Sequence, residues 1–183
     1  MTLPARDDLI IRDVTEDDMA SIQQIYADEV LHGVSSWEED PPSVAEMALR
    51  RDGIVNAGYP YRVAVLDGAV IGFAYASAYR PRPAYRHTVE NSIYIAAQAQ
   101  RAGIGRRLLT DLIDVCTKLN FRQMIAVTGD SHNLRSIDFH LKMGFKKIGT
   151  INSIGFKFGR WLDSVVLQRP LGDGDNTLPE PRR

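Results

Sequence analysis

Residues 100–105, QRAGIG, place two glycines one residue apart at the start of a helix-like run. Glycine has no Cβ, so the backbone can approach a ligand closely and adopt φ values that other residues avoid. The first amides of a helix have no partner within it and lie at the positive end of its dipole. The segment therefore favours a backbone site for an anion such as a diphosphate, with Arg101, Arg106 and Arg107 adding positive charge. A plain strand-to-helix turn is the alternative.

The same segment does not match two common phosphate-binding motifs. A GxGxxG dinucleotide fingerprint needs glycine where Leu108 stands, and the sequence contains no GxxxxGK[ST] phosphate loop. The spacing of the glycines alone therefore leaves the anion unidentified.

The elements that must position this turn follow from hydrophobic spacing and turn residues. The expected strands are 9–14, 61–66, 69–79, 87–95, 123–128, 145–151 and 161–171, and the expected helices are 15–30, 43–55, 105–120 and 133–143. Asp67-Gly68 forms the tight turn of the clearest hairpin. Hairpins mixed with a strand-helix-strand unit predict an α+β domain with one mixed sheet and helices on its faces.

The composition describes an ordinary folded domain. The chain has 183 residues, 44% of them hydrophobic, with a formal net charge of -1, which gives no general attraction to nucleic acid or acidic membranes. No apolar run is long enough to span a bilayer, and no histidine pairs with another histidine or with Cys116 at a zinc-ligand spacing. We expect one domain over residues 1–171, a flexible tail over 172–183, a cytoplasmic location and no metal.

The motifs taken together resemble a known family. Q-x-x-G-x-G between a strand and a helix is similar to the acetyl-CoA pyrophosphate motif of the GNAT superfamily of N-acetyltransferases, and the order of elements resembles that fold from about Leu9 to Leu171. TVENSIYI, FHLKMGF and GFKFGRWLD resemble the phosphinothricin and methionine sulfoximine acetyltransferases more narrowly. The resemblance implies a mostly antiparallel central sheet flanked by helices on both faces, acetyl-CoA as acetyl donor, and a homodimer.

The resemblance also implies how acetyl-CoA binds. One strand would separate from its neighbour IAVT and bind the pantetheine arm through its backbone, namely Ser92, Ile93, Tyr94 and Ile95. The diphosphate would lie on the turn formed by Arg101, Ala102, Gly103, Ile104, Gly105 and Arg106. Asn133 stands where the family has an asparagine that contacts the cofactor. Asparagine is also a favoured N-cap residue, and the two roles are compatible.

Two residues are candidates for proton transfer, which acetyl transfer to an amine requires. Glu90 lies in an otherwise apolar strand and stands where the family has its proposed base; a solvated strand face is the alternative. His140 occupies the position of the tyrosine that serves as general acid in many GNAT enzymes, and its ordinary pKa lets it donate or accept a proton near neutral pH. A structural histidine is equally consistent with the sequence.

The substrate pocket is expected around the loop before the Glu90 strand. Arginine binds carboxylates through a planar fork of donors, so Arg80 or Arg86 could hold an amino-acid carboxylate, while a solvent-exposed basic loop is the alternative. The family often has tryptophan where Tyr79 stands, which puts the preferred substrate in doubt. The residues assigned to the pocket are Tyr79, Arg80, Pro81, Arg86, Val89, Glu90 and Asn91.

The sequence thus predicts an acetyl-CoA-dependent N-acetyltransferase that acts on a small amino-acid-like amine by direct attack in a ternary complex. The substrate would be of the phosphinothricin, methionine sulfoximine or methionine sulfone type. Cys116 lies far along the chain from Glu90, which argues against an acetyl-cysteine intermediate. An acetyltransferase for peptide N-termini or polyamines and a non-catalytic acetyl-CoA-binding module remain as alternatives. Neither a nucleic acid nor a membrane is expected as a partner.

Overall fold

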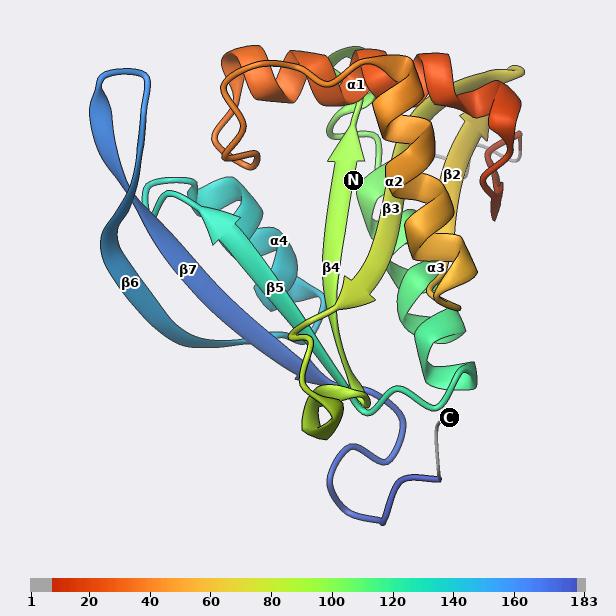
Figure 1. The fold of residues 1–183 in the computed structure, drawn as a ribbon, viewed down its shortest axis with the longest axis vertical. Coiled ribbons are helices and arrows are strands. Elements are labelled where there is room, and N and C mark those ends of the chain that lie inside the picture. Colours follow the sequence, from red (N-terminus) through yellow and green to blue (C-terminus); the bar gives the residue numbers. More distant parts are fainter. Residues whose placement is uncertain (1–7, 181–183) are drawn as a thin grey trace.

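The computed structural model describes residues 8–180, which form a seven-stranded sheet and four α-helices (Figure 1). The strands are β1 (Ile10–Asp13), β2 (Tyr61–Leu66), β3 (Ala69–Ala78), β4 (Thr88–Ile95), β5 (Gln123–Gly129), β6 (Lys146–Lys157) and β7 (Arg160–Pro170). The helices are α1 (Met19–His32), α2 (Val44–Asn56), α3 (Ile104–Lys118) and α4 (Leu134–Lys142), with 3-10 turns at Glu16–Asp18, Pro83–Tyr85 and Ala97–Ala99. The predicted order of elements is confirmed.

The sheet has the strand order β1-β2-β3-β4-β5-β7-β6 and is antiparallel except between β4 and β5. The parallel pair is short: its register runs from Thr88 opposite Gln123 to Asn91 opposite Ala126. Beyond those residues β4 continues to Ile95 and β5 to Gly129 without pairing to each other. The predicted separation of the two strands is therefore confirmed, and it leaves a split in the middle of the sheet (Figure 1).

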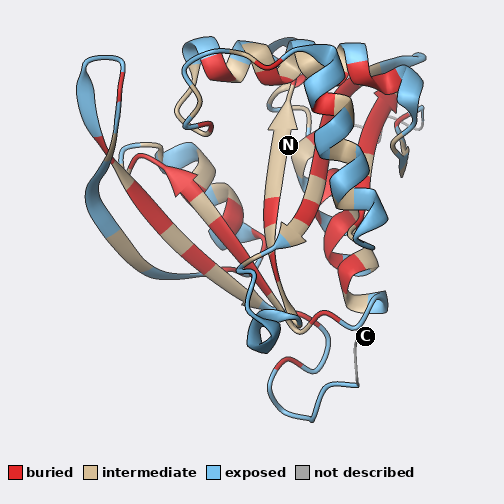
Figure 2. Ribbon diagram, in the orientation of Figure 1, coloured by how far each residue is buried: buried red, intermediate tan, exposed pale blue. Residues whose placement is uncertain are grey.

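Helices cover both faces of the sheet, as expected. Side chains alternate between the faces of a strand, so the neighbours Phe73 and Ala74 of β3 enter different cores. Phe73 packs with Ile22 of α1 and Val63 of β2. Ala74 packs with a second cluster that contains Leu108 and other residues of α3. The buried residues consequently lie along the strands and the inner sides of the helices (Figure 2), which confirms the mixed, mostly antiparallel α+β fold class.

The hairpin of β6 and β7 is longer than the sequence predicted. The predicted strand 145–151 stops short of the observed end of β6 at Lys157. It stops where the strand becomes irregular, since Ser153 has a φ of 50° and the register shifts between Ile151 and Gly155. Pairing resumes after this irregularity and runs to Lys157 opposite Arg160. The hairpin therefore extends away from the rest of the sheet (Figure 1).

The segment after β7 folds back toward β5. The Arg122 guanidinium donates hydrogen bonds to the carbonyl oxygens of Gly174 at 3.0 Å and Thr177 at 2.8 Å. A flexible tail was predicted from residue 172, and the boundary at 171 stays a prediction. Residues 1–7 of the predicted domain and 181–183 of the predicted tail lie outside the described residues. Across residues 8–180, no helix combines the length and the apolar character that crossing a membrane requires.

Candidate active site

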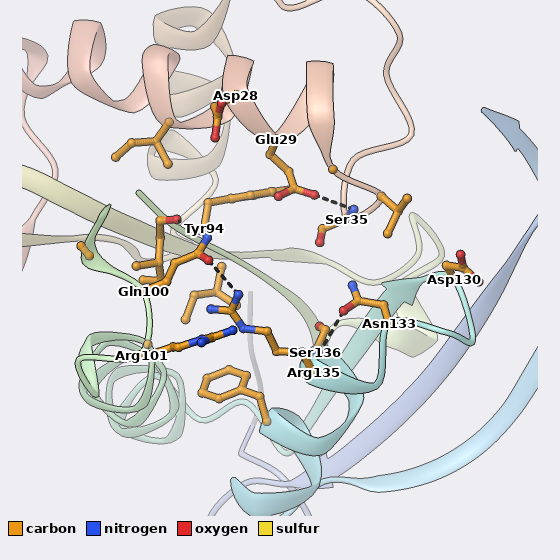
Figure 3. Close-up of a pocket in the computed structure, with 18 of the residues that line it drawn as sticks. Asp28, Glu29, Ser35, Tyr94, Gln100, Arg101, Asp130, Asn133, Arg135 and Ser136 are labelled. Atoms are coloured by element: carbon orange, nitrogen blue, oxygen red, sulfur yellow. Dashed lines mark hydrogen bonds between the residues drawn. The ribbon is translucent and has the colours of Figure 1, made fainter. Parts of the chain in front are cut away.

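A cleft of about 700 Å³, here called the large cleft, lies where β4 separates from β5. Its walls come from α1, the loop after α1, the end of β4, the turn before α3, and α4 (Figure 3). Asp28 and Glu29 of α1 stand on one side, and Arg101 and Arg135 stand on the other. The predicted anion-binding turn and the unpaired end of β4 therefore border one cleft.

The turn before α3 presents backbone as well as arginine side chains to the large cleft. Arg101 has a φ of 65° and Gly103 a φ of 77°, and α3 starts at Ile104 without a side-chain cap. Left-handed residues near the first turn of a helix direct successive N–H groups into a concave anion site. A Cβ added at Gly103 would meet no described atom within 4 Å. The open space in front of Gly103 fits a diphosphate group that touches the backbone.

Not every predicted residue of this turn reaches the cleft with its side chain. Gly103, Gly105, Arg101 and Arg106 line it. The Ile104 side chain is buried in the core instead, and Ala102 packs against the same core, so these two residues can contribute only their backbone.

Gln100 fixes the turn to its surroundings. Its Nε2 donates to the carbonyl oxygen of Ile95 at 3.2 Å, and its Oε1 accepts from Arg135 at 2.7 Å (Figure 3). Arg135 is a further cation of the large cleft beside Arg101 and Arg106, and the sequence analysis missed it. Its position two residues after Asn133 on a predicted helix was the only available signal. Arg160 also lines this cleft, where it is paired with Asp130.

Asn133 caps α4 and also lines the large cleft. Its Oδ1 accepts from the backbone N–H of Ser136 at 3.2 Å, which confirms the N-cap interpretation. A contact with the cofactor stays a prediction.

A second cleft of about 360 Å³, here called the small cleft, lies at the split itself. It shares Ser35, Ile93, Tyr94 and Ser136 with the large cleft, so the two are neighbours. Glu90, Asn91, Ser92 and His140 line the small cleft only.

Glu90 is half-buried in the small cleft. Burial raises the pKa of its carboxyl group above the ordinary value, and the positive charge of Arg80 opposes part of that rise. A carboxylate with a raised pKa holds a proton more readily than an ordinary surface carboxylate. Glu90 therefore has the electrostatics that a general base for an amine needs.

His140 is buried, with 3% of its surface exposed. Its Nδ1 lies 2.8 Å from the carbonyl oxygen of Ser136, so Nδ1 carries the proton and donates. Burial lowers the pKa of the imidazole, although the bond to Ser136 opposes this. The ring is thus favoured in its neutral form, with an unprotonated Nε2 that lies 3.4 Å from Asn91 Oδ1.

Comparisons with known proteins give this geometry its context. Residues 11–166 match the family model described as an acetyltransferase (GNAT) domain. This chain belongs to the GNAT family of acetyltransferases.

Individual relatives agree with the family assignment. The chain is 50% identical over 170 residues to the phosphinothricin N-acetyltransferase of Alcaligenes faecalis, covering 93% of this chain and 86% of that one. It is 33% identical over 165 residues to the L-methionine sulfoximine/L-methionine sulfone acetyltransferase of Salmonella typhimurium, covering 90% and 96%. The crystal structure of a GNAT superfamily phosphinothricin acetyltransferase from Sinorhizobium meliloti in complex with AcCoA matches with a TM-score of 0.91, at 50% identity and 94% coverage of each chain. The resemblance read from the sequence is confirmed.

The residues that form one wall of the small cleft, Tyr26, Ser36 and Glu38, were not predicted from the sequence. The Tyr26 hydroxyl donates to Glu38 Oε1 at 2.8 Å and lies 2.9 Å from Ser36 Oγ. Arg50 binds the same Glu38 carboxylate at 2.6 and 3.2 Å and thereby lowers its pKa. Burial raises the pKa of Tyr26 to about 12. Glu38 is therefore a paired anion and Tyr26 a neutral hydroxyl.

The predicted substrate residues are only partly brought together. Glu90 and Asn91 line the small cleft. Within the part of the chain that the structure describes, neither cleft is lined by the other five predicted substrate residues, Tyr79, Arg80, Pro81, Arg86 and Val89. Arg80 stacks its guanidinium 5.2 Å from the centre of the Tyr79 ring and is close enough to lower the pKa of Glu90. Arg86 instead donates to the Pro83 carbonyl oxygen at 3.1 Å in an exposed position.

Two further residues of the predicted substrate set lie away from the cleft lining. Val89 is buried in the core with none of its surface exposed, because it points to the opposite face of β4 from Glu90. Pro81 is exposed in the loop before β4. Their part in substrate binding stays a prediction.

Proposed function

We propose that this chain transfers the acetyl group of acetyl-CoA to the amine of a small amino-acid-like compound. The substrate class is phosphinothricin, methionine sulfoximine or methionine sulfone. The observation that carries the proposal is the placement of Glu90 and His140 at the split, beside a large cleft that ends on the turn at Gly103. The names and substrates of the relatives support the choice of compound.

The acetyl donor is held mainly by backbone in this proposal. The N–H groups at the start of α3 bind the diphosphate, and Arg101, Arg106 and Arg135 balance its charge. The unpaired edge of β4 over residues 92–95 binds the pantetheine arm. Acetyl-CoA supplies the acetyl group as a thioester, which an amine can attack directly.

Glu90 removes a proton from the substrate ammonium group, directly or through one water, and so generates the neutral amine. The amine nitrogen attacks the carbonyl carbon of the thioester, so the C–N bond forms as the C–S bond breaks, and the departing thiolate takes up the proton that the attacking nitrogen gives up. His140 in its neutral form accepts a hydrogen bond at Nε2, so we assign it to the orientation of polar groups at the split and to proton relay. That role fits its lowered pKa better than a permanently charged acid does.

A polyamine acetyltransferase is the second candidate. Among the described residues that line the small cleft there are two carboxylates, Glu38 and Glu90, and no lysine or arginine. Arg50 already neutralises Glu38, which leaves Glu90 for one amine. An amino acid additionally needs a cation for its carboxylate, and Arg80 beside Glu90 can provide it at the rim.

The deciding experiment measures thiol release from acetyl-CoA with an amino acid, its amide and a polyamine. We expect the acid to be the best substrate. Arg80→Ala should lower kcat/KM for the acid roughly ten- to hundredfold, the worth of one charge-assisted hydrogen bond of ~1.5–3 kcal/mol, and change the amide little. Arg82→Ala, in the same exposed loop, is the matched control. A polyamine that outperforms the acid would replace the first candidate with the second.

We also propose that the protein is a homodimer through the β6–β7 hairpin. Exposed apolar residues gathered on one element are typical of a protein interface. The hairpin and its turn carry six such residues, each at least 50% exposed: Ile148, Ile151, Ile154, Phe156, Phe158 and Trp161. Phe156→Asp should shift the sedimentation coefficient toward that of a monomer. Leu49→Asp, at an exposed leucine of α2, should not. Equal behaviour of both variants would contradict the proposed interface.

A further inference from the structure

Thr128 of β5 carries a buried hydroxyl that the chemistry above does not use. Only 3% of the residue is exposed, and Oγ1 has no hydrogen-bond partner within residues 8–180. Thr128 lies two residues beyond Ala126, the last residue of β5 that pairs with β4, and it lines the small cleft. A buried hydroxyl without a partner destabilises the folded chain, so its presence at the split calls for a functional reason.

Asn91 carries a similar group on the other side of the split. It is 6% exposed, and its Nδ2 also has no hydrogen-bond partner in the described chain. Its Oδ1 faces the unprotonated Nε2 of His140. Turning the amide over would let Nδ2 donate to Nε2, but would leave Oδ1 without a partner. In either orientation one end of the amide is free to bind a ligand.

Strand alternation places both groups on the same face of the sheet. Met124 and Ala126 of β5 belong to the core under α3 and α4. Thr128 lies two residues after Ala126 and therefore points to the same face. Val89 of β4 belongs to the same core, and Asn91, two residues further along β4, points to the same face as Val89. Glu90 points to the opposite face, where Tyr26 and Glu38 form the wall of the small cleft. The base and the two unpartnered groups thus lie on opposite faces of the split.

This arrangement separates the two substrates. The amine must approach Glu90, so it occupies the face covered by α1. The turn that binds the diphosphate starts α3, on the other face, and Phe139 and Ser136 of α4 line the large cleft on that side. Residues of α1 close the large cleft from the first face, away from Glu90, which lines the small cleft only. The polar groups at Asn91 and Thr128 are therefore left for the acetyl donor.

We propose that Thr128 is a binding residue for the acyl donor, and that its hydroxyl donates a hydrogen bond to a carbonyl oxygen at the thioester end, beside the Asn91 amide. The inference rests on the proposed function. Two carbonyls of the donor share this chemistry, that of the thioester and that of the nearest pantetheine amide. Removal of the hydroxyl should weaken donor binding without harming the fold.

The test uses Thr128→Val, which keeps the shape and removes the hydroxyl, and Thr128→Ser, which restores it. Dissociation constants for acetyl-CoA and for CoA are measured by calorimetry, together with Tm of the protein alone. We expect Thr128→Val to raise the Kd of acetyl-CoA about three- to tenfold, with Tm unchanged or higher. Thr128→Ser should return Kd to within about twofold of the parent value. A rise for acetyl-CoA alone identifies the thioester carbonyl, and an equal rise for CoA identifies the amide.

Thr117→Val is the matched control, because its hydroxyl donates to the Ile113 carbonyl oxygen within α3 at 2.8 Å, away from both clefts. Its donor affinity should equal that of the parent. A lower Tm with unchanged Kd for Thr128→Val would show a structural hydroxyl and overturn the proposal, as would an effect on the KM of the amine alone. If the parent fails to bind acetyl-CoA, the proposed function itself is overturned. If the parent and Thr128→Val bind acetyl-CoA equally well, only the proposed role of Thr128 is overturned.

Discussion

The large and the small cleft are neighbours that are built in different ways. The anion-binding part of the large cleft is one continuous segment, residues 100–106, and it acts through backbone N–H groups and left-handed residues. The small cleft is built from side chains of α1, the loop after it, β4, β5 and α4. A backbone site is encoded in local sequence, whereas a side-chain site exists only after the sheet has brought distant segments together.

Their charges differ in the same way. The large cleft carries Arg101, Arg106 and Arg135 in exposed positions around its turn, across from the carboxylates of Asp28 and Glu29 on α1. The small cleft carries the half-buried Glu90 and the buried, neutral His140. Solvent-exposed cations suit a highly charged ligand that arrives from water. Buried groups with shifted pKa values suit proton transfer.

The largest effect should come from the small cleft. Glu90→Gln keeps the shape and removes the base, and one such group contributes about 10²–10⁴-fold to rate. We expect kcat to fall by that factor while the Kd of acetyl-CoA stays the same. Glu39→Gln, at an exposed glutamate of the loop after α1, should keep full activity. Near-parental turnover by Glu90→Gln would assign Glu90 to packing.

The pH–rate profile gives an independent measurement of the same residue. The base must be deprotonated, and burial raises the pKa of Glu90, so activity should be lost on acidification at a pH above the usual carboxyl range. The residual activity of Glu90→Gln should lack this acidic limb. An identical limb in both proteins would point to another group.

A smaller effect is expected at the turn of the large cleft. Gly103→Val places a branched side chain where the diphosphate touches backbone and forces a φ of 77° on a residue that avoids it. We expect the Kd of acetyl-CoA to rise roughly ten- to hundredfold because the side chain obstructs the diphosphate, which corresponds to a loss of about 1.4–2.8 kcal/mol of binding free energy.

Gly58→Val isolates the ligand effect from the backbone strain. Gly58 has a φ of 78° and also has no atom within 4 Å of an added Cβ, but it lies after α2 and lines neither described cleft. The two variants should lose similar amounts of thermal stability. Equal Kd values for both variants would show that the Gly103 turn does not bind the donor.

The difference between a backbone site and a side-chain site also explains which features of the two clefts could be predicted from the sequence and which could not. The turn at residues 100–105 and the order of elements were visible because glycine spacing and hydrophobic periodicity are local. Glu90 and His140 were found through a resemblance, and the structure brings both to one cleft. Ser36 and Glu38 were missed because they lie in a loop of 11 residues between two helices, and a loop has no periodic pattern that indicates its position. Tyr26 of α1 and Arg135 of α4 were missed because helical periodicity identifies a helix but not which cleft a polar side chain of that helix borders.

The same limit applies to strand ends and orientation. Val89 was predicted to belong to the substrate pocket, and alternation along β4 directs its side chain into the core, which the sequence analysis did not indicate. The β6–β7 hairpin was predicted too short because a bulge interrupts its pattern. Thr128 gave no signal, since a threonine in a strand is ordinary until its hydroxyl is found buried and unpartnered.

The loop after α1 joins the two clefts, so a change there should affect both. Lys157 of β6 is 3% exposed and donates to the carbonyl oxygens of Ser36 at 2.9 Å and Gly33 at 3.2 Å. Gly33 lines the large cleft and Ser36 the small one. Lys157→Met should raise both the Kd of acetyl-CoA and the KM of the amine about three- to tenfold, as expected when ~1 kcal/mol of anchoring is lost.

Lys147→Met is the control for this loop, because Lys147 lies on the same strand but is exposed. It should leave both constants unchanged. A change in only one constant for Lys157→Met would show that the loop serves one cleft alone.

The smallest effect should appear in the pH dependence of stability at His140. Its pKa in the folded protein is lowered from the ordinary 6.5 by burial, so below pH 6.5 the unfolded chain binds this proton more readily than the folded one. The associated stability is complete above pH 6.5 and is lost as the pH falls through the lowered pKa. His140→Gln should therefore show a shallower fall of Tm on acidification than the parent. Because carboxylates titrate alike in both proteins, the difference between the slopes isolates the histidine.

His32→Gln provides the reference for that comparison, because His32 is exposed on α1. Replacing this exposed side chain should change Tm less than replacing the buried His140 does. If the Tm of His140→Gln followed that of the parent on acidification, the imidazole would be charged inside the fold at low pH, and its Nε2 would then donate rather than accept at the split. That outcome would restore His140 as a general acid and would make the small cleft, like the large one, a site with a positive charge.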